Sequence, residues 1–167
     1  MLGVGAVGQT QVDNASGAIN ALLRSLPLKA GDILVDFAVV YQPFAEFYSW
    51  LEATKGVRVV TVPMMWPLNT TAQIVNAFRD TLASTTATGR RIAYAVVSHV
   101  SSYPCIKMPV AELTKVSHEH GVPIIVDGAH ALGNIPVNIA ALGGVDFWFG
   151  NGCVLMFHLP KAVAATS

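Results

Sequence analysis

Short runs of apolar, mostly β-branched residues constrain the fold of this 167-residue chain more than any other feature. The clearest is Ile124–Val126, which follows Pro123 and ends at Asp127. A run of this kind is typical of a strand that is buried on both faces, as in a parallel sheet with helices on each side. Similar apolar runs near residues 33–36, 57–62, 92–97 and 145–149 extend the pattern along the chain.

Helical spacing of apolar residues separates these strands. Ile19, Leu22, Leu23 and Leu26 form one stripe, and Asn14 or Ser16 is expected to cap that helix. Further helices are expected near 43–54, after Asn69 or Thr70, and from Pro109 to His120. Strands that alternate with helices predict an α/β fold, a three-layer sandwich around a mostly parallel sheet.

The end of the chain predicts a different local structure. Asn151 and Gly152 stand between two apolar runs, which is a strong signal for a tight β-hairpin. We therefore expect strands near 145–149 and 153–157 to pair antiparallel. From Pro160 onward the small residues predict an irregular tail.

Composition narrows the function. Only 12% of the residues are charged, against about 25% in an average soluble domain, and the mean hydropathy is +0.51. We therefore expect apolar faces that other segments or a second copy would cover, and self-association of the chain alone. A formal net charge of zero argues against nucleic acid and anionic membranes as partners.

The sequence also contains no targeting signal and no metal-binding motif. No apolar stretch approaches the roughly 18 residues of a membrane-spanning helix, and Met1–Gly8 lacks the features of a signal peptide. Cys105 and Cys153 form no CxxC motif and are expected to be reduced thiols in a cytoplasmic protein. We expect no metal site.

Asp127 is the first candidate for a functional residue. An ionised carboxylate at the tip of a buried strand needs a partner, and ligands of open α/β sheets bind beyond the carboxyl ends of the strands. Gly128 and Ala129 leave room for a ligand, and His130 adds a second polar group. On this pattern alone, an Asp that merely caps the next turn is an equally good interpretation.

An ordered set of motifs resembles a known family. The set includes Ser98–Ser102, Met108–Leu113, His118–Gly121, Val126–Ala131, Gly133–Val137 and Asp146–Asn151, preceded upstream by Asp13–Gly17 and Leu26–Asp32. In this order and spacing they resemble the class V aminotransferases, fold-type I enzymes that use pyridoxal 5'-phosphate (PLP), and in particular the isopenicillin N epimerase-like branch. The resemblance implies part of the large domain of such an enzyme, without an N-terminal arm or C-terminal small domain.

The resemblance also implies site residues. Asp127 would accept a hydrogen bond from the pyridine nitrogen of PLP, and His130 would bond its phenolic oxygen. Ser16 and Gly17 would meet the phosphate at a helix N-terminus, although the same residues are common helix caps. Tyr41 would lie near the cofactor or simply pack in the core. Ser101 lies where the family places polar contacts to cofactor or substrate.

The lysine that the family uses to attach PLP as a Schiff base is missing. In the family this lysine belongs to the segment that directly follows a strand ending in Gly-Asn. Here Gly152-Cys153 follows Asn151 instead, as if about ten residues were deleted. Lys161 is the only lysine after position 115. Across a strand of about seven residues it would lie on the order of 20 Å away and would be a solvated tail residue. We therefore assign no catalytic residue.

Two classes of function stay open at this stage. One, as the resemblance implies, is a PLP-dependent transferase, lyase or epimerase that acts on an amino acid as its small-molecule substrate, with homodimers as in the family and with impaired chemistry in this chain. The other is a non-catalytic domain that binds a phosphate-bearing ligand or a partner subunit.

Overall fold

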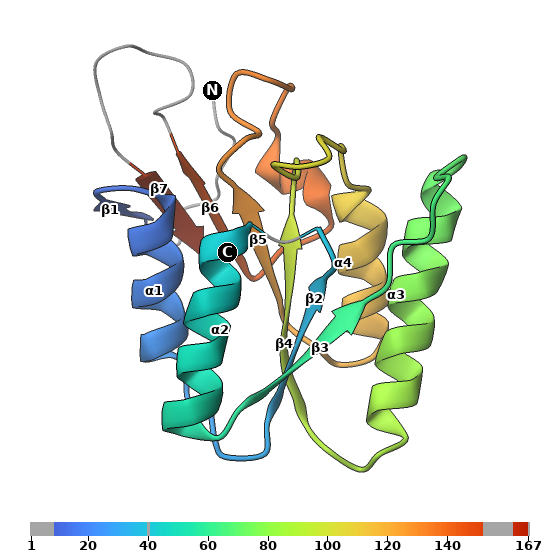
Figure 1. The fold of residues 1–167 in the computed structure, drawn as a ribbon. Coiled ribbons are helices and arrows are strands. Elements are labelled where there is room, and N and C mark those ends of the chain that lie inside the picture. The colour runs from blue at the N-terminus through green and yellow to red at the C-terminus, as the bar shows by residue number, and fades with distance from the viewer. Residues whose placement is uncertain (1–8, 40, 152–161, 167) are drawn as a thin grey trace.

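A seven-stranded sheet forms the centre of the molecule (Figure 1). The computed structural model describes residues 9–39, 41–151 and 162–166. The strand order across the sheet is β1-β7-β6-β5-β4-β2-β3. The strands are β1 (Gln9–Val12), β2 (Ile33–Phe37), β3 (Arg58–Val62), β4 (Ile92–Ser98), β5 (Ile124–Gly128), β6 (Phe147–Asn151) and β7 (Ala162–Thr166).

Five strands, β3, β2, β4, β5 and β6, run parallel to one another. Their register aligns Ser98 with Asp127 and Asp127 with Phe149, so the carboxyl ends of β4, β5 and β6 meet at one edge. β7 pairs antiparallel with both β6 and β1. The expected α/β fold around a mostly parallel sheet is confirmed.

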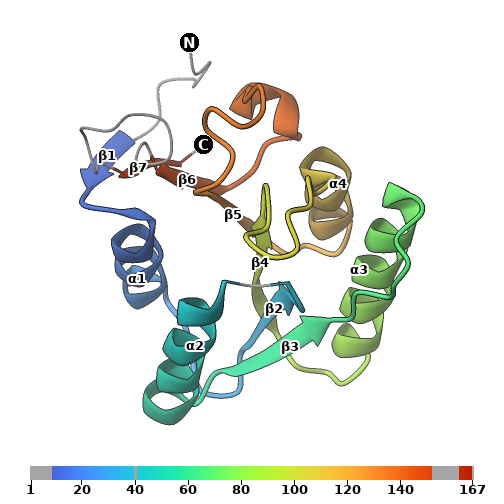
Figure 2. The same ribbon diagram turned by 45° about the horizontal axis from the view of Figure 1, so that its top comes forward.

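Helices cover both faces of the sheet (Figure 2). They are α1 (Ala15–Ser25), α2 (Gln42–Lys55), α3 (Thr71–Thr86) and α4 (Val110–Glu119), with a short 3₁₀ turn at Ile139–Leu142. One core cluster joins α1 and α2 to one face of the sheet, and a second joins α3 and α4 to the other. Two helical layers with a sheet between them make the three-layer sandwich.

Local signals explain where the helices begin and end. Asn14 caps α1 by accepting a hydrogen bond from the Gly17 amide at 2.8 Å, which decides between the two expected caps. Thr70 and Gln73 form a capping box at the start of α3. α4 follows Pro109, and the chain turns after it at Gly121, whose φ of 67° favours glycine.

The end of the chain differs from expectation. The region after Pro160 was expected to be an irregular tail, but Ala162–Thr166 forms β7 and pairs with β6 from Asn151 back to Phe147. The expectation failed because an alanine-rich segment has little intrinsic strand propensity. Pairing with two neighbouring strands stabilises β7 instead. The expected strand 153–157 and its hairpin turn at Gly152 lie outside the described residues.

In the described ranges, no helix combines the length and the apolar character that a membrane span requires.

Candidate functional site

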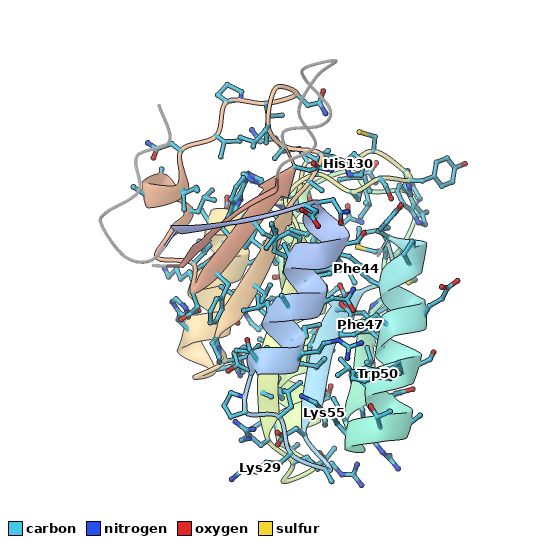
Figure 3. The ribbon with its side chains drawn as sticks, turned by 90° about the vertical axis from the view of Figure 1, so that its left-hand side faces the viewer. Lys29, Phe44, Phe47, Trp50, Lys55 and His130 are labelled. Atoms are coloured by element: carbon cyan, nitrogen blue, oxygen red, sulfur yellow. The ribbon has the colours of Figure 1, made fainter. Side chains whose placement is uncertain are left out.

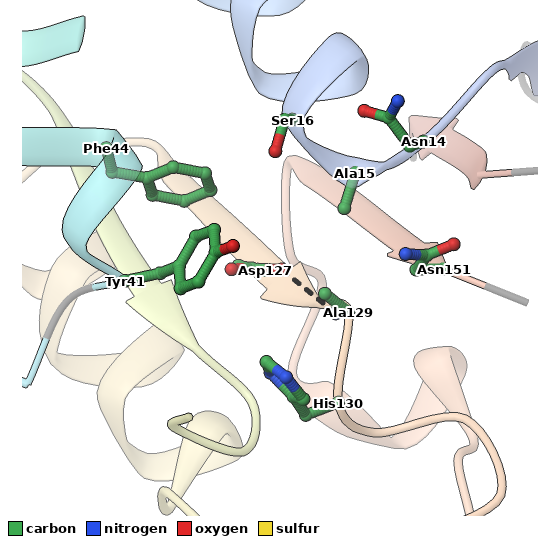
Figure 4. A pocket seen from close by; sticks show the side chains of 9 residues that line it. All are labelled: Asn14, Ala15, Ser16, Tyr41, Phe44, Asp127, Ala129, His130 and Asn151. Atoms are coloured by element: carbon green, nitrogen blue, oxygen red, sulfur yellow. Dashed lines mark hydrogen bonds between the residues drawn. The ribbon is translucent and has the colours of Figure 1, made fainter. Parts of the chain in front are cut away.

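A pocket of about 140 Å³ lies at the carboxyl end of the sheet, where β5 and β6 end and α1 and α2 begin (Figure 4). Four separate parts of the chain build it, because parallel strands bring their ends to one edge. Its lining residues are Asn14, Ala15, Ser16, Tyr41, Phe44, Asp127, Ala129, His130 and Asn151.

Asp127 supplies the buried charge of this pocket. It is 6% exposed, and its Oδ1 accepts a hydrogen bond from the Ala129 amide at 2.9 Å. Within the described part of the chain, no other donor bonds its carboxylate. Burial raises the pKa of Asp127 to about 6, against the lowering effects of the Ala129 hydrogen bond and of His130. The second oxygen can therefore accept a hydrogen bond from a cationic N–H donor of a ligand.

The N-terminus of α1 forms the opposite wall. Ser16 lies in the first turn and is exposed, and the amides of Ala15 and Ser16 have no acceptor inside the helix. The helix dipole adds a partial positive charge here. Gly17 contributes less than expected, since the Asn14 side chain already occupies its N–H group. The wall can therefore bind an anionic group through Ser16 and the two free amides.

Aromatic rings from α2 and the turn before it close another side. The rings of Tyr41 and Phe44 meet edge to face with centroids 6.0 Å apart, and Phe44 also contacts Phe149 at 6.4 Å. Phe44 is buried, whereas Tyr41 is 42% exposed at the mouth. This wall offers apolar contact to a planar ligand.

Trp148 fixes the strand ends beneath the pocket, on the other face of the sheet. A Cβ atom built on Gly128 would come within 2.1 Å of the indole ring, and one built on Gly150 within 2.4 Å. Both glycines are therefore required for the ring to lie flat against β5 and β6. The indole Nε1 also donates a 3.5 Å hydrogen bond to Nδ1 of His99, whose pKa burial lowers to about 4.

The structure brings four of the six residues named from sequence into the pocket lining: Ser16, Tyr41, Asp127 and His130. Gly17 is the next residue of α1 after Ser16 and is not among the lining residues. Ser101 lies elsewhere, because its hydroxyl donates to the Pro104 carbonyl and accepts from the Ile106 amide at 3.0 Å. The Ser101 hydroxyl is therefore already engaged, as donor and as acceptor, within its own loop.

The lining also contains residues that were not among the site residues expected from the sequence: Asn14, Ala15, Phe44 and Asn151, together with Ala129, which was expected only to leave room for a ligand. Asn14 and Asn151 could have been predicted from the sequence, because each stands at the end of an expected helix or strand. Phe44 is a buried residue in the first turn of α2, where that helix reaches the pocket.

No described lysine lines the pocket. Lys29 and Lys55 lie at the other end of the molecule from His130 (Figure 3). Lys107 and Lys115 belong to the loop before α4 and to α4 itself. The pocket as described therefore contains a carboxylate, an imidazole and hydroxyls, but no amine.

Comparison with known proteins places this arrangement in a family. The model of the family described as Aminotransferase class-V matches residues 11–152. An L-cysteine desulfhydrase of Arabidopsis thaliana is 32% identical over 92% of this chain and 35% of its own length. An isopenicillin N epimerase of Streptomyces clavuligerus is 29% identical over 83% of this chain and 33% of its own length.

Solved structures share the fold at lower identity. The complex of the cystine C-S lyase C-DES with its reaction product cysteine persulfide matches with a TM-score of 0.79 and 20% identity over 95% of this chain and 41% of that one. The apo cysteine desulfurase of Thermococcus onnurineus NA1 gives a TM-score of 0.78, also at 20% identity, over 95% of this chain and 38% of that one. The chain spans about a third of the length of the curated relatives it matches.

Proposed function

Since this chain belongs to the class V aminotransferase family, we propose that its Asp127 pocket is a reversible binding site for PLP. The observation that carries the proposal is the buried Asp127 carboxylate, which has one bonded oxygen and one oxygen without a donor in the described residues. A buried carboxylate of this kind is costly unless a cationic donor meets it. A protonated pyridine nitrogen is such a donor.

The other walls fit the remaining parts of PLP. A phosphate would bind Ser16 and the free amides of Ala15 and Ser16 at the positive end of α1. His130 would hydrogen-bond the phenolic oxygen. The aromatic wall of Tyr41 and Phe44 would exclude water from the ring. Each contact uses a side chain or amide of the described pocket, and none of them needs a lysine.

Bound PLP supplies an electron sink for carbanions at the α-carbon of an amino acid. Asp127 would keep a proton on the ring nitrogen, and the low polarity around it would strengthen that charge-assisted hydrogen bond. The family relationship makes an amino acid the expected substrate class. The chain therefore retains the residues that bind and polarise the cofactor.

We infer that this chain performs no PLP-dependent turnover. The nine residues after Asn151, 152–160, include no lysine, and no described lysine lines the pocket. Without an amine among the described lining residues there would be neither a covalent anchor nor a base to move protons at the substrate, and positioned acid–base catalysis alone contributes roughly 10²–10⁴-fold. A non-catalytic domain that binds a phosphate-bearing ligand is the alternative that the same observation favours.

The relation to a whole enzyme is also a proposal. We propose that residues 1–167 correspond to part of a large domain and that the chain associates with a second copy of itself. Location in the cytoplasm stays a prediction.

A titration with PLP tests the proposed site. Calorimetry on the folded wild-type chain should give saturable binding that inorganic phosphate weakens by competition. A Ser16→Ala chain should bind PLP more weakly, whereas Ser49→Ala, which removes an exposed hydroxyl of α2 outside the pocket, should bind like wild type. No binding, or equal loss in both variants, would refute the site.

A further inference from the structure

A second buried carboxylate lies on the same face of the sheet as Asp127. Asp36 is in β2 and is 4% exposed. Its Oδ1 accepts a hydrogen bond from the Phe37 amide at 2.7 Å, and its Oδ2 accepts one from the Tyr48 hydroxyl of α2. The proposed function gives this group no role.

The sheet geometry puts both carboxylates under the same helices. Leu34 and Ile125 belong to the core cluster beneath α1 and α2. Asp36 and Asp127 lie two residues further along the same strands and therefore point to the same face. The ring of Tyr41, just before α2, contacts Phe44 with centroids 6.0 Å apart, and Phe44 contacts Tyr48 at 6.4 Å. These rings lead from the Asp127 pocket to Tyr48, the partner of Asp36.

The two carboxylates open to different hollows. Asp127 lines the pocket at the carboxyl end of β5. Asp36 and Tyr48 line a separate hollow of about 410 Å³ between α2 and the edge strand β3, together with Glu52 and Thr61. A ligand that fills the Asp127 pocket therefore does not fill the hollow beside Asp36.

We propose that Asp36, positioned by Tyr48, is a proton reservoir for the Asp127 site: it carries the proton while Asp127 is ionised, and it loses that proton to the α2–β3 hollow when a cation pairs with Asp127. The reaction is the dissociation of one O–H bond of the Asp36 carboxyl, with the proton passing to water. The inference rests on the proposed function for the cation, but the coupling between the two carboxylates exists without any ligand.

Two like charges on one buried face explain the coupling. Burial raises the pKa of Asp36 to about 7, the hydrogen bonds from Tyr48 and Phe37 lower it, and the charge of Asp127 raises it again. Asp127, with a pKa of about 6, ionises first as pH rises. A protonated ring nitrogen on Asp127 cancels the repulsion, so Asp36 then ionises at lower pH.

The other titratable groups near the pair are few in the described part of the chain. α2 brings Tyr48 and Glu52, the turn before α2 brings Tyr41, and the turn after β5 brings His130. The β3 residues of the hollow are Val59 and Thr61, and the α1 residues of the pocket are Asn14, Ala15 and Ser16, none of which carries a charge. Glu52 lies in the hollow of Asp36 itself, so Asp127 is the carboxylate that a ligand of the other pocket can neutralise.

Carbon-13 NMR of the ligand-free chain tests the coupling directly, by following the Asp36 carboxyl signal against pH. In Asp127→Asn the midpoint of Asp36 should fall by about one pH unit, because a neighbouring charge is gone. Glu112→Gln removes an equal charge from an exposed position of α4 and should leave the midpoint unchanged. Tyr48→Phe should raise it, because the phenol donor is lost. An Asp36 midpoint that is the same in all four chains would overturn the proposal.

Calorimetry supplies the second arm, with PLP titrated at pH 7 in two buffers of different ionisation enthalpy. Wild type should release more protons on binding than Asp36→Asn, by up to about half a proton for a group half-protonated at that pH. Equal proton counts in two chains that both bind PLP would contradict the reservoir. If PLP binds neither chain, the proposed function fails, and the NMR midpoints still decide the carboxylate coupling.

Discussion

Ala162 pairs with Asn151 across the ladder of β6 and β7, so β7 begins at the end of the sheet that carries the Asp127 pocket. The expected distance of about 20 Å between Lys161 and Asn151 assumes that an apolar strand of about seven residues carries the chain away from Asn151. That basis is lost, because the strand that pairs with β6 in the described residues starts at Ala162, the residue after Lys161. Lys161 is therefore the amine that most needs testing.

We predict that PLP forms no stoichiometric covalent adduct with this chain. Borohydride reduction of the PLP-treated protein, followed by peptide mapping, should give scattered, substoichiometric labels on exposed lysines. Lys161→Ala should bind PLP as wild type does, with Lys115→Ala on α4 as the matched control. A single full adduct on Lys161, with transamination or desulfuration activity that Lys161→Ala abolishes, would show that the chain is an enzyme.

The parallel core was predictable because each of its strands is an apolar run bounded by turn residues. Asp127 was predictable for the same reason, as a charge at the tip of such a run. β7 was missed because Ala162–Thr166 has small side chains, and its place depends on pairing with β6 and β1. Asp36 follows the same rule as Asp127 and could have been named. Ser101 could not be excluded from sequence, since only the folded loop shows that its hydroxyl is already bonded.

The packing of Trp148 gives a stability prediction. Gly128→Ala should reduce the free energy of unfolding by roughly 2 kcal/mol or more, because the added methyl group overlaps the indole ring in a packed core. Urea unfolding followed by circular dichroism measures the loss. Trp148→Phe in the same chain should recover part of it.

The matched control for Gly128 is Gly17→Ala, where the nearest atom to the added Cβ is Asn14 Oδ1 at 3.5 Å. This change should be neutral or stabilising by about 0.5–1 kcal/mol, because it removes a glycine from a helix. Equal effects at both positions would show that the indole does not lie against Gly128.

His99 gives a pH dependence of stability. Its pKa falls from 6.5 to about 4 in the folded chain, mainly through burial. The stability from its neutral form is complete above pH 6.5 and is lost as pH falls toward 4, by on the order of 3 kcal/mol. The raised pKa values of Asp36 and Asp127 act in the opposite direction between pH 4 and 6.5. The stability that comes from their protonated forms is lost as pH rises.

His99→Gln isolates the histidine, since glutamine keeps an acceptor for Trp148. The difference in unfolding free energy between the two chains should be constant above pH 6.5 and should shift in favour of His99→Gln between pH 6.5 and 4. Urea titrations across this range measure it. A difference that does not change with pH would mean that His99 accepts a proton in the folded state.

Exposed apolar side chains predict self-association. Among the described residues, the large hydrophobic side chains that are exposed are Tyr41, Met65, Trp66 and Tyr103. All four lie on loops that follow β2, β3 or β4, at the carboxyl end of the sheet. Light scattering should show concentration-dependent association that a Trp66→Ser, Tyr103→Ser double variant reduces.

The matched control for association is Cys105→Ser, which removes an exposed thiol from the same loop as Tyr103. It should associate like wild type in reducing buffer. A monodisperse wild-type monomer at moderate concentration would contradict the prediction.

Equilibrium binding of PLP to wild type and Asp127→Ala is the most direct test of the account. Without the carboxylate, the ring nitrogen loses a charge-assisted hydrogen bond worth about 1.5–3 kcal/mol, so affinity should fall about 10- to 100-fold. Calorimetry on chains whose fold is confirmed by circular dichroism should show weak, saturable binding to wild type and that loss in the variant. Equal affinities, or no binding to a folded wild-type chain, would contradict the assignment of the Asp127 pocket to PLP.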